Sequence, residues 1–401
     1  MDVNSKFSEI SKGLKGSAVR ELLKYAEKPD VISFGGGMPN PLSFPIKDVE
    51  DIVHYILENY GAKALQYGST EGVEELRELI STRLNSKYNF NARKENIIML
   101  NGSQSGLYMV SKVFLNRKDY VISEAPTYVG AIAAFNAQDP SWLAIDLEND
   151  GMDLNMLEKK IKFALNEGKT PKFIYVIPTF QNPAGLTWSL SKRKELLEIA
   201  SKYDLIVFED DPYNEIRFSG EPVSPIKSLD KENRVIYMGT FSKVLSPGIR
   251  LGYIFANDEI LRKISLLKQG VDLCTNVFSQ YLAMEYLKRG VIDQQVPKIV
   301  DLYRKKRDLM LESLEKYMPD GTEWTRPEGG MFLWVTLDKK IDTEILLKKA
   351  LEKKVAYVIG SAFYPDGRGK NSMRLNFTYS KDNDIIEGIK RLGSVIREEM
   401  S

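Results

Sequence analysis

The chain has 401 residues, of which 43% are hydrophobic and 28% charged, and its formal net charge is +1. This length supports two domains with sizeable cores, and the near-neutral charge argues against nucleic-acid partners or electrostatic binding to a membrane. His54 is the only histidine and Cys274 the only cysteine, which excludes an intrachain disulfide, zinc clusters and Ser-His-Asp or Cys-His catalysis. No signal peptide or membrane span is visible, and we expect a cytoplasmic protein without metal sites.

A glycine run near the N-terminus, Phe34-Gly35-Gly36-Gly37-Met38-Pro39, invites comparison with dinucleotide-binding loops. Its spacing is not G-x-G-x-x-G, and a proline-rich stretch follows where the helix of such a motif should begin. The run therefore predicts no dinucleotide site.

Apolar, strand-like segments alternate with helical patterns from about residue 97 to 256, as the βαβ units of a mainly parallel sheet require. After about residue 295 the chain changes to long charged helices and strands such as 331–335, which indicates a smaller α+β domain. The expected fold class is α/β, with a large domain that contains a mainly parallel seven-stranded sheet covered by helices. The expected strands are 97–100, 120–123, 142–146, 173–177, 205–209, 235–239 and 251–256.

Two of the earlier strands run into segments suited to binding. After residues 97–100, a glycine turn leads into the start of a helix, whose free backbone N–H groups make an anion site. N-capping of this helix by Ser103 would explain the same residues. Glu124-Ala125-Pro126-Thr127-Tyr128 follows the next strand, although a lone tyrosine more often belongs to a core.

Polar side chains also follow two later strands, where open α/β sheets place ligand chemistry. Asn182 lies in an Asn-Pro-x-Gly turn after one strand and can hydrogen-bond a phenolate or a carboxylate. Asp210 ends the next strand, and Tyr213 follows it. The neighbouring Glu209 and Asp211 are expected to form an ordinary acidic turn.

The segment from Thr240 to Arg250 gathers a lysine, two hydroxyls and an arginine between two core strands. An amine in a partly desolvated pocket loses its proton easily and forms a Schiff base with an aldehyde such as pyridoxal phosphate. Lys243 offers this amine, and Thr240, Ser242 and Arg250 offer donors for the phosphate. Asp210 would then keep the pyridinium nitrogen protonated. Taken alone, the segment fits a solvated lysine equally well.

Near the C-terminus, Ser372–Phe377 reads as a strand in which Arg374 faces opposite to its apolar neighbours. The planar guanidinium suits bidentate binding of a carboxylate. The alternative is a solvated arginine on a strand.

In series these segments resemble the fold-type I pyridoxal-phosphate aminotransferases, in particular the branch of the kynurenine/2-aminoadipate aminotransferases and their prokaryotic multi-substrate relatives. The resemblance covers nearly the whole chain and implies the fold of aspartate aminotransferase. It implies an N-terminal segment 1–50 that joins the small domain, a large cofactor-binding domain 51–295 and a small C-terminal domain 296–401. It also implies that Lys243 is catalytic. The cofactor contacts that it implies are Tyr67, Ser103, Gln104, Tyr128, Asn182, Asp210, Tyr213 and Arg250.

The resemblance also bears on assembly and substrate. Tyr67 matches the segment through which a neighbouring subunit reaches the phosphate, which implies a homodimer with shared sites. Arg374 matches the arginine that binds the substrate α-carboxylate beside Asn182, and Gly36 would leave room for that carboxylate. Relatives that accept acidic side chains use an arginine at the position of Arg20; otherwise this residue is solvated or swings away and admits aromatic or branched side chains.

The expected activity is transfer of an amino group between an L-amino acid and a 2-oxo acid, with Lys243 as the general base. We expect glutamate and 2-oxoglutarate as one pair, with 2-aminoadipate, aromatic or branched-chain amino acids as the other substrates. A lyase or decarboxylase on the same fold stays open, because fold does not fix function. A ligand-sensing transcription regulator is disfavoured, because the chain starts almost directly at the aminotransferase-like segment and carries no basic excess.

Overall fold

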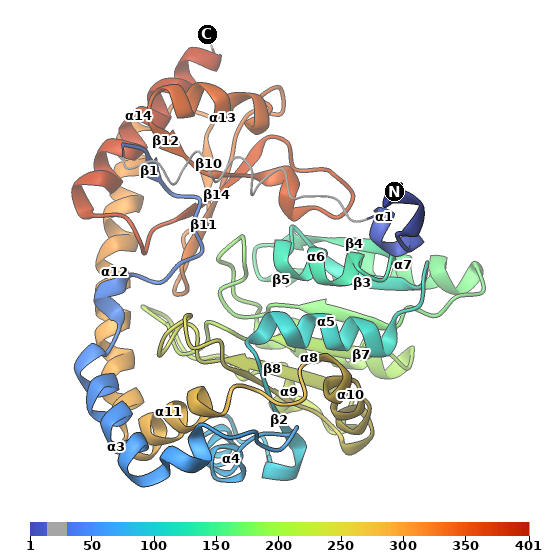
Figure 1. Cartoon of the computed structure of the whole chain (residues 1–401). Coiled ribbons are helices and arrows are strands. Elements are labelled where there is room, and N and C mark those ends of the chain that lie inside the picture. Colours follow the sequence, from blue (N-terminus) through green and yellow to red (C-terminus); the bar gives the residue numbers. More distant parts are fainter. Residues whose placement is uncertain (14–29, 401) are drawn as a thin grey trace.

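The large sheet of this computed structural model, which describes residues 1–13 and 30–400, contains all seven expected strands (Figure 1). Its central strands pair in parallel, whereas β9 and the short β5 at one edge run antiparallel. The α/β prediction is confirmed, and β5 is an addition to it. In spatial order the strands are β2 (Ile97–Leu100), β9 (Gly252–Phe255), β8 (Val235–Thr240), β7 (Ile206–Asp210), β6 (Phe173–Val176), β3 (Tyr120–Ala125), β4 (Ser141–Glu148) and β5 (Gly151–Met152).

Helices cover both faces of this sheet, so its strands are apolar on both sides. On β6, Phe173 and Tyr175 pack toward one set of helices, while Ile174 and Val176 pack toward the other. The first set is α5 (Ser103–Phe114), α6 (Val129–Asn136) and α10 (Asp258–Val271). The second set is α7 (Leu154–Asn166), α8 (Leu190–Lys202) and α9 (Ile226–Leu229).

Local sequence explains where several of these helices begin. The side chains of Asp153 and Ser189 accept hydrogen bonds from the first turns of α7 and α8. Asn257 caps α10 in the same way. The helix α5 differs, because Gly102 precedes it and no side chain caps its first turn.

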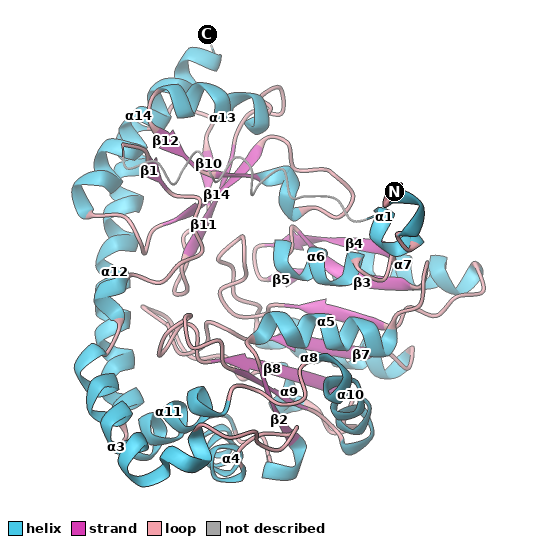
Figure 2. Ribbon diagram, viewed as in Figure 1, coloured by secondary structure: helices cyan, strands magenta, loops and turns pink. Residues whose placement is uncertain are grey.

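A second, antiparallel sheet lies beyond the large one (Figure 2). Its order is β10 (Glu323–Trp324), β11 (Phe332–Thr336), β14 (Ser372–Asn376) and β13 (Val358–Ile359). The long helix α12 (Val291–Tyr317) runs along one side of the molecule and packs against α14 (Asp382–Met400) (Figure 1). The helix α13 (Thr343–Glu352) packs against α14 as well. The N-terminal β1 (Ile32–Ser33) pairs in parallel with β12 (Val355–Ala356). The domain boundaries at residues 50 and 295 stay a prediction.

The remaining helices are α1 (Glu9–Gly13), α3 (Ile46–Ala64), α4 (Glu74–Tyr88) and α11 (Val277–Lys288). The helix α11 packs on both α3 and α4 and shares with them a core that continues to β8 and β9. Among the described residues, no helix combines the length and the apolar character that a membrane crossing requires.

Candidate active site

The carboxyl ends of β6, β7 and β8 lie side by side, because these three strands pair in parallel in the middle of the sheet. The turn after β6 carries Asn182, β7 ends at Asp210, and β8 ends at Thr240. Lys243 follows in the next turn. Parallel pairing thus brings together residues that lie up to 61 positions apart in the sequence.

A chain of hydrogen bonds connects the two sheets at this edge. Asn182 Nδ2 donates to Tyr213 Oη over 3.4 Å, and Arg374 Nη1 donates to Asn182 Oδ1 over 3.1 Å. Arg374 Nη2 donates to the carbonyl oxygen of Gly35 over 2.9 Å. One amide therefore faces both a phenol and a guanidinium, and Arg374 also holds the N-terminal glycine run in place.

Arg374 is buried among aromatic rings. Its guanidinium lies 4.1 Å from the ring centroid of Phe332 and 5.1 Å from that of Phe363. Burial lowers the pKa of Arg374 to about 10, and its Nε atom is buried without a hydrogen-bond partner. No aspartate or glutamate among the described residues forms an ion pair with this buried cation, so the arrangement favours an anionic ligand.

Lys243 has an amine of unusually low basicity. Burial by the surrounding protein lowers its pKa to about 8, and the positive charges of Arg374 and Arg250 act in the same direction. Its Nζ donates to the carbonyl oxygen of Gly37 over 3.1 Å. Part of the side chain stays accessible, so a ligand can reach an amine that gives up its proton easily.

Hydroxyl, guanidinium and backbone donors gather at the start of α5. A Cβ atom at Gly102 would lie only 2.3 Å from Arg250 Nη2, so this arginine rests directly on the glycine turn. Thr240 Oγ1 donates to Ser242 Oγ over 3.0 Å. Ser103 is the first helical residue and does not cap α5, so the N-capping alternative is wrong. These donors and the N–H groups of the first turn together suit an anion such as phosphate.

The side chains of Gln104 and Tyr128 both lie against Gly130. Gln104 Nε2 donates to the carbonyl oxygen of Gly130 over 2.8 Å. A Cβ atom on Gly130 would lie 2.5 Å from the Tyr128 ring and 2.6 Å from Gln104 Oε1, so only glycine fits there. Tyr128 lies close enough to Tyr213 and Arg374 for its phenolate form to affect the pKa of both residues.

Three expected residues remain: Gly36, which lies between the Gly35 and Gly37 carbonyls that accept from Arg374 and Lys243, and Tyr67 and Arg20. The side chain of Tyr67 is 78% exposed. A Cβ atom on Gly36 would meet only the end of Met38, at 3.4 Å, so the space beside it is open. Arg20 lies outside the described residues.

Two buried side chains next to the site, Tyr175 and Glu124, were not predicted as site residues from the sequence. Tyr175 donates to Asp210 Oδ2 over 2.7 Å. Glu124 accepts hydrogen bonds from the backbone N–H of Ile177 and from the side chains of Gln181 and Trp188. It thereby ties the loop of Tyr128 to the loop of Asn182. Glu124 could have been recognised, because it is a charged residue directly after an apolar strand. Nothing in the sequence distinguished Tyr175 from an ordinary core residue.

The expected acidic turn at Glu209 and Asp211 is wrong, because both side chains are buried. Glu209 accepts hydrogen bonds from the backbone N–H groups of Ile226 and Lys227, at the start of α9. Asp211 accepts from Tyr237 Oη over 2.9 Å and from Asn214. Both carboxylates thus serve the packing of the layer around β7.

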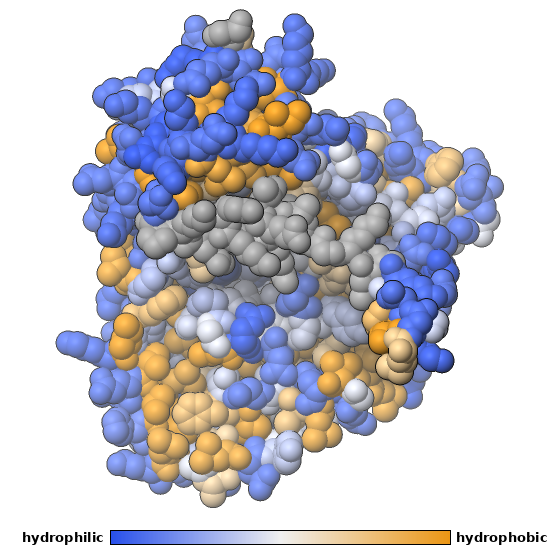
Figure 3. All heavy atoms as spheres, turned by 45° about the horizontal axis from the view of Figure 1, so that its top comes forward, coloured by the Kyte–Doolittle hydropathy of each residue, from blue (hydrophilic) through white to orange (hydrophobic). Residues whose placement is uncertain are grey.

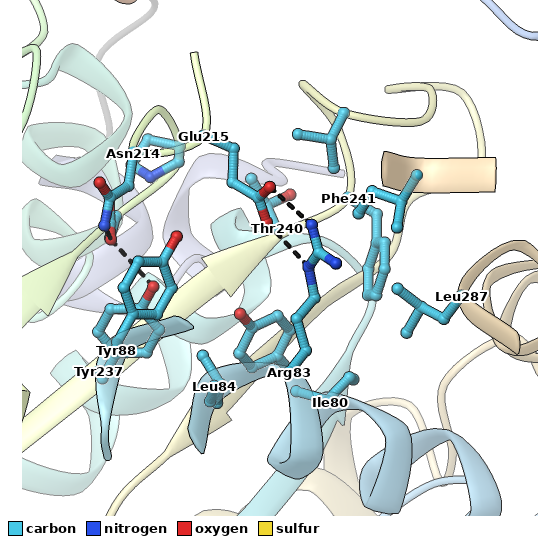
Figure 4. Close-up of a pocket in the computed structure, with 15 residues that line it drawn as sticks. Ile80, Arg83, Leu84, Tyr88, Asn214, Glu215, Tyr237, Thr240, Phe241 and Leu287 are labelled. Atoms are coloured by element: carbon cyan, nitrogen blue, oxygen red, sulfur yellow. Dashed lines mark hydrogen bonds and ion pairs between the residues drawn. The ribbon is translucent and has the colours of Figure 1, made fainter. Parts of the chain in front are cut away.

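A cavity of about 50 Å³ adjoins the site and shares Thr240 with it (Figure 4). Arg83 on α4 crosses this cavity and binds both carboxylate oxygens of Glu215, at 3.0 and 2.7 Å. Glu215 lies two residues after Tyr213, so this bidentate pair fixes the loop that carries Tyr213.

Pyridoxal phosphate, the expected cofactor, fits these residues. Asp210 is buried, and no lysine or arginine in residues 1–13 or 30–400 forms an ion pair with it. A buried carboxylate of this kind lacks a cationic partner, which a pyridinium nitrogen supplies. Lys243 offers the amine for the aldehyde, and the donors around Arg250 suit the phosphate.

Comparison with known proteins agrees with this fit. Residues 30–392 match the family described as Aminotransferase class I and II. The aromatic-amino-acid aminotransferase 1 of Thermococcus litoralis is 49% identical over 400 residues, which are 100% of this chain and 96% of that protein.

Two solved structures resemble the chain over its whole length. The kynurenine aminotransferase of Pyrococcus horikoshii, in complex with PMP, KYN as substrates and KYA as products, has a TM-score of 0.97 at 49% identity and covers 100% of this chain and 99% of its own. The α-aminoadipate aminotransferase LysN of Thermus thermophilus, complexed with N-(5'-phosphopyridoxyl)-L-leucine, has a TM-score of 0.91 at 36% identity, with coverage of 100% and 99%.

Proposed function

Because this chain belongs to the class I and II aminotransferases and depends on pyridoxal phosphate, we propose that it moves amino groups between glutamate and a set of larger 2-oxo acids. The proposed partners of the glutamate/2-oxoglutarate pair are 2-aminoadipate, aromatic and branched-chain amino acids. The relatives support this choice, since they are named for aromatic amino acids, kynurenine and α-aminoadipate, and one holds a leucine adduct.

The observation that carries this proposal is the buried guanidinium of Arg374. It faces Asn182, lies close enough to Lys243 to lower the pKa of the lysine, and has no acidic partner among the described residues. An amino acid supplies a carboxylate for Arg374 and a Cα proton for the amine of Lys243, which is easily deprotonated and can then act as the base.

We assign the remaining residues by their chemistry. When bound, pyridoxal phosphate supplies an electron sink for negative charge at the substrate Cα. Asp210 would bind its ring nitrogen, Asn182 and Tyr213 its phenolic oxygen, and Tyr128 the face of its ring. Lys243 would remove the proton at the substrate Cα and return a proton later. The phosphate would be bound by Ser103, Gln104, Thr240, Ser242 and Arg250.

The choice of substrate side chain is assigned to two residues near the N-terminus. We propose that Arg20 binds the distal carboxylate of glutamate and 2-aminoadipate, and that it turns away for aromatic and branched side chains. Gly36 would leave room for the α-carboxylate, in keeping with the open space beside it.

The test is a donor panel with 2-oxoglutarate as the acceptor. We expect glutamate to form from 2-aminoadipate, phenylalanine or leucine. The variant Arg374→Gln should lower kcat/KM about 10- to 100-fold for every donor, because one charge-assisted pair is lost, while the exposed Arg326→Gln should not. Arg20→Gln should slow only the acidic donors. Release of ammonia or carbon dioxide without glutamate would identify a lyase or decarboxylase, and cofactor binding without turnover would indicate a ligand sensor.

We also propose that the chain forms a homodimer with shared active sites. Large apolar side chains gather on the lower half of the face shown in Figure 3. Large apolar side chains exposed on and around α3 include Leu42, Ile46, Tyr55, Leu57, Leu65 and Tyr67. Covering such a surface stabilises an oligomer. Sedimentation should give twice the chain mass for the wild type and for Phe163→Glu, an exposed position on α7, whereas Leu65→Glu should dissociate the protein; a monomeric wild type would overturn the proposal.

A further inference from the structure

The two carboxylate oxygens of Asp210 have different surroundings. Oδ2 accepts the hydrogen bond from Tyr175 Oη, at 2.7 Å. Oδ1 accepts no hydrogen bond from the described residues, and this atom is not sealed from solvent. One oxygen is therefore held by the protein, and the other remains open to a ligand.

Tyr175 is rigidly placed for this contact. It lies on β6, where its backbone pairs with that of Phe208 on β7, and its side chain is fully buried. The rings of Phe135 and Phe208 pack edge-on against it, with centroids at 5.3 and 5.6 Å. Burial and the nearby carboxylates hold the pKa of Tyr175 well above its usual value, so its hydroxyl keeps its proton and can only donate to Asp210.

The other groups around Asp210 either raise its pKa or do not change it. Burial raises its pKa to about 7, and the charge of Asp211 acts in the same direction, against the hydrogen bond from Tyr175. Glu124 lies close enough for the charges of the two carboxylates to interact, and the phenol of Tyr213 also faces Asp210. Tyr175 is the only described side chain whose hydrogen bond stabilises the carboxylate form of Asp210.

We propose that Tyr175 is a positioning residue that keeps Asp210 ionised and turns its free oxygen toward the ring nitrogen of the cofactor. The inference rests on the role proposed for Asp210. Without the Tyr175 hydroxyl, the carboxylate binds a proton more tightly and competes with the ring nitrogen for it. The ring then withdraws electrons less strongly, and the cofactor is held less firmly.

The resting protein tests this without turnover, through a pH titration of the visible absorbance of the bound cofactor and through the cofactor Kd. We expect Tyr175→Phe to raise the Kd about tenfold, because a hydrogen bond to a charged group is lost. The pH at the midpoint of the absorbance titration should rise as well. In turnover, kcat should fall with little change in KM. Tyr357→Phe is the control, since Tyr357 is equally buried and donates to the carbonyl oxygen of Thr343 over 2.7 Å, away from the site.

The variant Asp210→Asn distinguishes a failure of the role proposed for Tyr175 from a failure of the role proposed for Asp210. If it shifts the titration and Tyr175→Phe shifts it in the same direction but less, with no further effect in the double variant, the proposal holds. If Tyr175→Phe behaves like Tyr357→Phe while Asp210→Asn shifts the titration, Tyr175 is only a core residue. If Asp210→Asn changes nothing, the role of Asp210 itself is wrong.

Discussion

The basicity of Lys243 can be measured in protein from which the cofactor has been removed. Burial and two neighbouring guanidinium groups lower its pKa to about 8. At pH 7 such an amine is about one tenth unprotonated, whereas an ordinary lysine, with a pKa of about 10.4, is unprotonated in roughly one molecule in 2,500. Lys243 therefore presents a reactive fraction about 200 times larger than that of an ordinary lysine.

The assay uses the aldehyde itself. Cofactor-free protein is mixed with pyridoxal phosphate at a series of pH values, the bond to the amine is trapped by borohydride, and modified peptides are quantified by mass spectrometry. Modification of Lys243 should rise with pH and level off above an inflection near 8. The exposed Lys339, quantified in the same digests, reports the modification of an accessible lysine outside the site.

A substitution at Arg374 tests the cause of the shift. The variant Arg374→Gln removes one of the two positive charges that lower the pKa of Lys243, so the inflection should move to higher pH. Burial is the larger cause, so the inflection of Lys243 should stay below the ordinary lysine value of about 10.4. The exposed Arg326→Gln should leave it unchanged. An inflection of Lys243 at the ordinary lysine value of about 10.4, or one that does not respond to Arg374→Gln, would refute this reasoning.

Two further substitutions test other parts of the site. Gly102→Ala places a Cβ atom 2.3 Å from Arg250 Nη2, so the cofactor Kd measured by equilibrium dialysis should rise; Gly168→Ala, at a similar φ of +72° with nothing within 4 Å, should not change it. Glu124→Gln replaces one of the two accepting oxygens by an amide N–H group, which then faces either the donors of Ile177 and Gln181 or that of Trp188, so the free energy of unfolding in urea should fall by about 1–3 kcal/mol. The exposed Glu198→Gln should have no effect on unfolding, and equal stability of both variants would contradict the role of Glu124.

The strands of the large sheet could be predicted because each is a short apolar run followed by turn residues, a pattern that depends only on local sequence. The same pattern placed Asn182 and Asp210 at the ends of neighbouring strands. The start of α5 was harder, because Gly102 and Ser103 differ by one position and either can precede a helix. The structure decides it, since Gly102 has a φ of +77° and lies against Arg250.

Contacts between strands could not be predicted in this way. Tyr175 is 35 residues from Asp210 in the sequence and lies in the apolar run of β6, where a tyrosine reads as core. Only the register between β6 and β7 sets its hydroxyl against the carboxylate. Phe332 and Phe363, which enclose Arg374, likewise come from separate elements: Phe332 begins β11, and Phe363 ends the short 3-10 helix that follows β13.

The three consecutive carboxylates at the end of β7 show why position, and not charge, selects the functional one. Both oxygens of Glu209 accept backbone N–H groups at the start of α9. Asp211 keeps one oxygen without a partner, but this atom is sealed beside the internal cavity. Asp210 alone keeps an unpartnered oxygen that is not sealed. A cationic ligand that enters at the strand ends can therefore pair only with Asp210, although burial raises the pKa of all three carboxyls.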